Sequence, residues 1–266
     1  MPYATNPIDG RRISFEDDGG AGAPVVIHGG FLDPVPLVRR SPLAVALRPF
    51  ADEFRTVFVD HRGHGASDKP HEASAYAMPL RVADAISVLD ALDIEAAHFI
   101  GMSWGARLGF GIGHHSPERA LSLVLIGQQP YAIDPNGPLA RVVGEALKAS
   151  ETEGIEALVR AFEGIVGRYP DEVRAHYLAC DAAAMRAAWI AALAEGDVAD
   201  DLGRWTTRCL ICVAGEDVDF LEQSRRAASE IPGAEFLALG GEHHLGMDTA
   251  RVDPLLPAVL RTLRAF

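Results

Sequence analysis

The chain has few basic residues and no long apolar run, and each shortage excludes a class of protein. Only 24 Lys and Arg residues stand against 37 Asp and Glu residues, which gives a formal net charge of −13. A surface this acidic repels nucleic acid and anionic lipid, so neither is an expected partner. No apolar stretch is long enough to span a membrane, and the amino terminus lacks the basic and apolar regions of a signal peptide. We therefore expect a cytoplasmic protein that acts on a small molecule, with self-association into a homo-oligomer left open.

Cysteine is also scarce, with Cys180, Cys209 and Cys212 as the three examples. An odd number without a regular framework is typical of a reducing compartment. Cys209 and Cys212 have C-x-x-C spacing, but they lie in an apolar run that is typical of a buried strand. Because residues three apart on a strand point to opposite faces, we interpret this pair as core packing and not as a metal site.

Short β-rich runs alternate with longer helical patterns along most of the chain. This alternation is typical of an α/β fold with a mostly parallel sheet flanked by helices. The expected strands are residues 24–28, 56–60, 97–101, 122–126, 209–214 and 235–239. Residues 128–205 show only helical patterns, clearest over 154–167 and 181–196. We interpret them as a helical lid inserted into a core of residues 1–127 and 206–266.

A G-x-S-x-G pattern, Gly101-Met102-Ser103-Trp104-Gly105, follows one of these strands and precedes a helical stretch. A turn this sharp holds its serine in a strained backbone and exposes the hydroxyl above the sheet. Side chains at the two flanking glycines would clash with the turn. The pattern and its context together predict that Ser103 is a nucleophile.

A serine hydroxyl needs a positioned base to take its proton. After a nucleophile turn of this kind, the acid and then the histidine follow the serine along the chain. Three histidines follow the start of the predicted lid: His176, His243 and His244. His176 falls in a helix of the predicted lid. The other two follow the last expected strand, and such sheets place their chemistry at the carboxyl ends of strands.

Three motifs occur together in this order: His28-Gly29-Gly30-Phe31, residues 60–68 (DHRGHGASD) and Gly101 to Gly105. They resemble the α/β-hydrolase superfamily, most closely its single-domain esterases with a lid, over nearly all of the chain outside the lid. The resemblance implies an α/β-hydrolase fold and a Ser-His-Asp triad. Matching residues 239–246 to the family pattern L-P-G-x-G-H-L-G places the catalytic imidazole at His244. His243 then stands where the family has a glycine.

The triad acid is expected in the turn after strand 209–214. The family's aspartate usually stands three residues after the glycine of this turn, where the chain has Val218. Counting back from the next helix favours Asp217, with one residue deleted from the turn, and leaves Asp219 as the alternative. The acid would accept the second imidazole N–H and fix its tautomer.

An oxyanion hole requires two N–H donors near the serine. The backbone N–H of Trp104, the residue after the nucleophile, is the first. The resemblance implies that Gly30 supplies the second, with Phe31 as the alternative. Aromatic residues of the candidate substrate pocket are Phe31, Tyr131, Phe162 and Trp189.

These residues predict a hydrolase that cleaves a carboxylic ester or lactone through an acyl-enzyme on Ser103. A carbon–carbon bond hydrolase, a cofactor-free haloperoxidase and a ligand sensor that retains this frame are the alternatives. A serine nucleophile excludes haloalkane dehalogenases and epoxide hydrolases, which use a carboxylate. No nucleotide-binding glycine motif stands between a strand and a helix, so no cofactor is expected. The histidines of residues 60–68 are interpreted as structural, so no metal is expected.

Overall fold

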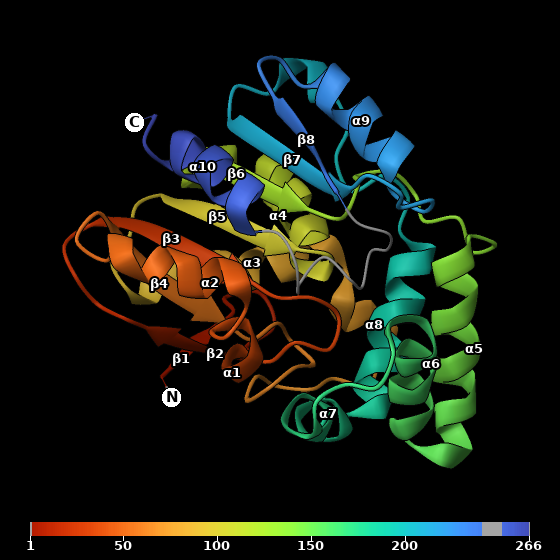
Figure 1. Ribbon diagram of the computed structural model, residues 1–266. Coiled ribbons are helices and arrows are strands. Elements are labelled where there is room, and N and C mark those ends of the chain that lie inside the picture. The colour runs from red at the N-terminus through yellow and green to blue at the C-terminus, as the bar shows by residue number, and fades with distance from the viewer. Residues whose placement is uncertain (1, 241–251, 266) are drawn as a thin grey trace.

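The computed structural model describes residues 2–240 and 252–265, and one eight-stranded sheet runs through them (Figure 1). Its strands lie in the spatial order β1-β2-β4-β3-β5-β6-β7-β8. Strands β1 and β2 pair antiparallel with their neighbours, and all the others run parallel. The strands are β1 (Tyr3–Thr5), β2 (Arg12–Asp17), β3 (Ala23–His28), β4 (Phe54–Val59), β5 (Ala97–Met102), β6 (Ala120–Ile126), β7 (Arg208–Ala214) and β8 (Glu235–Leu239).

All six strands expected from the sequence are confirmed, but the expectation missed β1 and β2. The six were recognised as nearly continuous apolar runs, which suit strands covered on both faces. Strand β2 instead places buried Ile13 beside exposed Arg12, and β1 has only three residues at the sheet edge. Neither leaves a continuous apolar run in the sequence.

Helices cover both faces of the sheet. Helices α3 (Met78–Ala91), α4 (Trp104–His115) and α9 (Leu221–Glu230) pack on one face, and α1 (Val35–Val38), α2 (Pro42–Leu47) and α10 (Val252–Leu263) pack on the other. Successive strand residues alternate between the two cores, as strand geometry requires. Cys209 and Cys212 are buried in opposite cores, which confirms that they are packing residues.

Four helices lie between β6 and β7, where the sequence predicts a lid. They are α5 (Pro138–Glu153), α6 (Glu156–Val166), α7 (Asp171–Leu178) and α8 (Ala182–Ala194), and they stand together beside the sheet in Figure 1. They share an apolar cluster that includes Leu158 and Met185, and α8 packs against Trp104 through its alanines. We call α5–α8 and their connections the helical insertion.

Arg107 holds both ends of the helical insertion against the core. This side chain is fully buried on α4, four residues after Ser103. Its guanidinium donates to the carbonyl oxygens of Gln129 and Tyr131 on one side, at 3.3 and 2.9 Å, and of Gly196 on the other, at 3.3 Å. The insertion is thereby tied to the helix that follows the nucleophile.

Within residues 2–240 and 252–265, no single helix is both long enough and apolar enough to cross a bilayer. The bent pair α7 and α8, which meet at 79°, meets that criterion only when the two are taken together.

Candidate active site

Ser103 stands at a strained turn between β5 and α4. Its backbone has φ 50° and ψ −107°, a conformation that residues other than glycine rarely adopt. A Cβ on Gly101 would lie 2.2 Å from the carbonyl oxygen of Gly105, and a Cβ on Gly105 would lie 2.5 Å from that of His28. The chain can therefore make this turn only with glycine at both flanking positions. The turn places Ser103 in the lining of a cavity.

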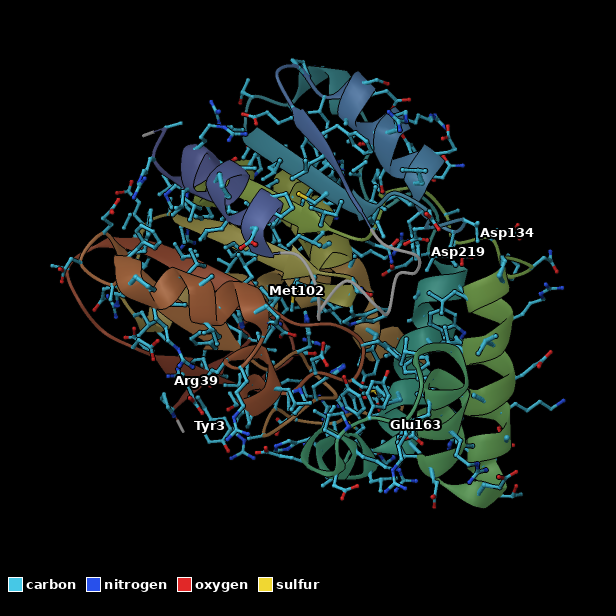
Figure 2. The ribbon with its side chains drawn as sticks, viewed as in Figure 1. Tyr3, Arg39, Met102, Asp134, Glu163 and Asp219 are labelled. Atoms are coloured by element: carbon cyan, nitrogen blue, oxygen red, sulfur yellow. The ribbon has the colours of Figure 1, made fainter. Side chains whose placement is uncertain are left out.

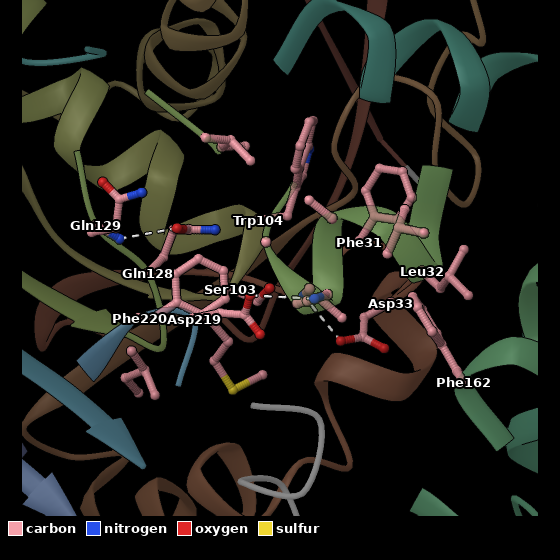
Figure 3. Close-up of a pocket in the computed structure, with 18 of the residues that line it drawn as sticks. Phe31, Leu32, Asp33, Ser103, Trp104, Gln128, Gln129, Phe162, Asp219 and Phe220 are labelled. Atoms are coloured by element: carbon pink, nitrogen blue, oxygen red, sulfur yellow. Dashed lines mark hydrogen bonds between the residues drawn. The ribbon is translucent and has the colours of Figure 1, made fainter. Parts of the chain in front are cut away.

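The cavity has a volume of about 410 Å³ and lies between the sheet and the helical insertion. Phe31, Phe162 and Trp189 line it as predicted, and Figure 3 shows Phe31 and Phe162 near Ser103. The ring of Phe31 lies 5.1 Å from that of Trp104 and 5.8 Å from that of Trp189, measured between centroids. Tyr169 and Tyr177 of the insertion complete a largely aromatic wall.

Tyr131, which we also expected in the pocket, is not among the residues that line the cavity. Its hydroxyl donates to Glu230 of α9 at 3.0 Å, and the guanidinium of Arg226 lies 4.1 Å from the centre of its ring. The main-chain carbonyl of Tyr131 accepts a bond from Arg107, and its side chain packs beside α9 against the core on that face of the sheet. The ion pair between Arg226 and Glu230 on α9 therefore sets the position of the Tyr131 side chain, and the sequence around Tyr131 does not reveal this contact.

The two predicted oxyanion donors both adjoin Ser103. Trp104 is the first residue of α4, where backbone N–H groups have no partner within the helix. A Cβ on Gly30 would lie 3.8 Å from the Cβ of Ser103, but the Gly30 N–H donates to a carboxylate oxygen of Asp33 at 2.9 Å (Figure 3). The other Asp33 oxygen accepts the hydroxyl of Tyr177 at 2.8 Å.

Asp33 was not among the site residues predicted from the sequence, although its position after a strand is a signal that could have found it. It is a carboxylate a few residues past the carboxyl end of β3, at the edge where parallel sheets gather functional groups. Gln128 and Gln129, just past the end of β6, line the cavity for the same reason and were also missed.

The segment at residues 60–68 supports the loop after β3 that carries Gly30. The Nε2 of His61 donates to the carbonyl of Gly29 at 3.1 Å, and that of His64 donates to the carbonyl of Phe31 at 2.6 Å. Burial lowers the pKa of both imidazoles below the usual value, so both remain neutral at pH 7. Their bonds hold the backbone around Gly30 in place.

Asp217 and Asp219 occupy different environments in the turn after β7. Asp217 is 3% exposed, and one of its oxygens accepts the backbone N–H groups of Asp219 and Phe220, both at 3.1 Å. Asp219 lines the cavity, and its carboxylate accepts the N–H of Leu139 at 3.2 Å. This bond attaches the turn after β7 to the start of α5, at the junction of core and insertion seen in Figure 2.

Both candidate histidines, His243 and His244, lie outside the described residues. Strand β8 ends at Leu239, close to the cavity that this residue helps to line. Leu239 also accepts the Gly215 N–H at 2.6 Å, which brings the ends of β7 and β8 together. The assignment of His244 as base therefore stays a prediction.

Known proteins of similar sequence place the chain in a family. A family model described as alpha/beta hydrolase fold matches residues 23–153. RutD of Pseudomonas syringae pv. syringae, assigned as a carbamate hydrolase, is 31% identical over 253 residues, which are 86% of this chain and 92% of RutD. The chain belongs to the α/β-hydrolase superfamily.

Two further comparisons of this α/β hydrolase differ in the share of each chain that the match covers. Mouse epoxide hydrolase 4 is 35% identical over 80 residues, but the match spans 30% of this chain and only 22% of that protein. The crystal structure of the enol-lactonase from Burkholderia xenovorans LB400 has a TM-score of 0.81 at 22% identity. It covers 98% of this chain and 99% of its own. That likeness confirms the predicted fold.

Proposed function

We propose that this α/β hydrolase cleaves a carboxylic ester or lactone through an acyl-enzyme on Ser103. The observation that carries the proposal is the strained turn that holds Ser103 against an aromatic cavity. The Ser103 hydroxyl attacks the carbonyl carbon while His244 takes its proton. The N–H groups of Trp104 and Gly30 stabilise the negative oxygen of the tetrahedral intermediate. His244 then protonates the leaving alcohol, and water releases the acid from Ser103.

Asp217 is proposed as the acid that orients His244. A triad acid stands behind the imidazole, away from the substrate, and Asp217 is buried and absent from the cavity lining. Its two backbone bonds fix the orientation of the carboxylate. Asp219 lines the cavity and bonds to the insertion, so its position favours a structural role.

Asp217→Asn is expected to lower kcat by about 10⁴, because the amide favours the wrong imidazole tautomer. Asp219→Asn should cost less than about tenfold, since an amide oxygen can still accept the Leu139 N–H. Steady-state kinetics of the two variants on one ester gives the ranking. The opposite ranking would identify Asp219 as the acid without changing the chemistry proposed for Ser103.

The proposal is tested with p-nitrophenyl esters of short acids and a serine-directed fluorophosphonate. We expect turnover that stops when one phosphonyl group per chain is bound, and peptide mass spectrometry should find that group on Ser103. Release of acid and alcohol in equal amounts separates ester cleavage from peroxide-dependent oxidation. A labelled chain that turns over no ester, lactone or amide would favour a ligand sensor.

A further inference from the structure

The charged side chains that line the cavity, among the described residues, are all acidic. Among the residues that the structure describes, the lining contains the carboxylates Asp33, Asp134, Asp219 and Glu222 and no Lys, Arg or His. Asp134 and Glu222 are exposed at the rim, and Asp33 is half-buried deeper in, beside the oxyanion loop. The chain as a whole is also acidic, at −13. Such a field concentrates cations at the site and repels anions.

Asp33 lacks a counter-ion within residues 2–240 and 252–265. It accepts bonds from two neutral donors, the Gly30 N–H and the Tyr177 hydroxyl, and forms no salt bridge there. A carboxylate that is partly shielded from water is stabilised by a nearby cation. The carboxylate instead lies at a cavity wall that includes the aromatic rings of Phe31 and Tyr177, and such rings can attract a cation.

Building on the proposed serine hydrolase function, we propose that its substrate carries a cationic group, an ammonium or a similar charge, which Asp33 binds beside the reacting carbonyl. The geometry also explains how binding would aid the reaction. An uncompensated carboxylate at Gly30 repels the oxyanion that forms on attack by Ser103 and occupies a donor that this oxyanion needs. A substrate cation at Asp33 neutralises that charge and competes with the Gly30 N–H for the carboxylate.

Matched ester pairs test the proposal on the intact protein. One pair places the charge in the alcohol: a choline ester and the 3,3-dimethylbutyl ester of the same acid, which has nearly the same shape without the charge. The second places it in the acyl group: the p-nitrophenyl esters of 4-(trimethylammonio)butyrate and 5,5-dimethylhexanoate. We expect kcat/KM to favour the cation by about tenfold or more in at least one pair. Equal values in both pairs would overturn the proposal.

Two isosteric variants then locate the charge that discriminates. Asp33→Asn keeps an oxygen for the Gly30 N–H but removes the charge, so the cation preference should fall to within about twofold of unity. Glu222→Gln removes the same charge at the exposed rim and should retain most of the preference. An Asp33→Asn enzyme with the full preference would refute the assignment of Asp33. Because each readout is a ratio of substrates on one enzyme, a change in overall activity does not affect it.

Failure of this inference is distinguishable from failure of the proposed function. An enzyme that cleaves the neutral esters and is labelled at Ser103, but ignores charge, retains its function and loses only the cationic substrate. A chain that is neither labelled at Ser103 nor active on any of the four esters would contradict the proposed function itself.

Discussion

Ser103→Ala is expected to lower kcat by about 10⁴–10⁶ while leaving the fold intact. Alanine has no hydroxyl to form the acyl-enzyme, so the remaining rate comes from binding and the oxyanion donors alone. The backbone bonds of the turn, from the Ser103 N–H to Ile126 and from Ala106 to the Ser103 carbonyl, persist in the variant. The measurement is single-turnover and steady-state kinetics on an ester, with circular dichroism and thermal melting to check folding.

Ser41→Ala is the matched control, because Ser41 also lines the cavity. Its hydroxyl caps α2 by accepting the Ala44 N–H at 3.3 Å, so its loss should cost about 1 kcal/mol of unfolding free energy. It should change kcat by less than about tenfold, because no acyl-enzyme forms there. A Ser103→Ala enzyme that retains a tenth of the wild-type activity would exclude Ser103 as the nucleophile.

His244→Ala should reduce kcat as severely as the serine substitution, by about 10⁴–10⁶, because triad members act as a unit. His243→Ala should have little effect on kcat. Fluorophosphonate labelling of Ser103 gives a second readout, and it should slow only in the His244 variant. His176→Ala on α7 is the control, since this histidine follows the nucleophile in sequence but is absent from the cavity lining. The reverse ranking of the two neighbours would place the base one residue earlier.

The parallel core of the sheet and the place of the nucleophile could be predicted from the residues alone. Both depend on local patterns: continuous apolar runs for β3 to β8, and a strand, a sharp glycine turn and a helix around Ser103. The two flanking glycines could be read from the sequence because the space that they need is set by the turn itself and by the adjacent strand end. The family resemblance predicted that Gly30 belongs to the oxyanion hole, and Gly30 does lie beside Ser103.

Which side chains surround the reacting group depends on contacts between segments that are far apart in the chain. Asp33 meets Tyr177 across 144 positions of sequence, and Asp219 meets Leu139 across 80. Tyr131 was expected in the pocket but lies against α9, 99 positions away at Glu230. Such contacts depend on how the helical insertion sits on the core, which Arg107 fixes from α4. Local periodicity specifies which face of a helix is buried, but it does not specify what that face meets, because the partner is set by packing between distant segments.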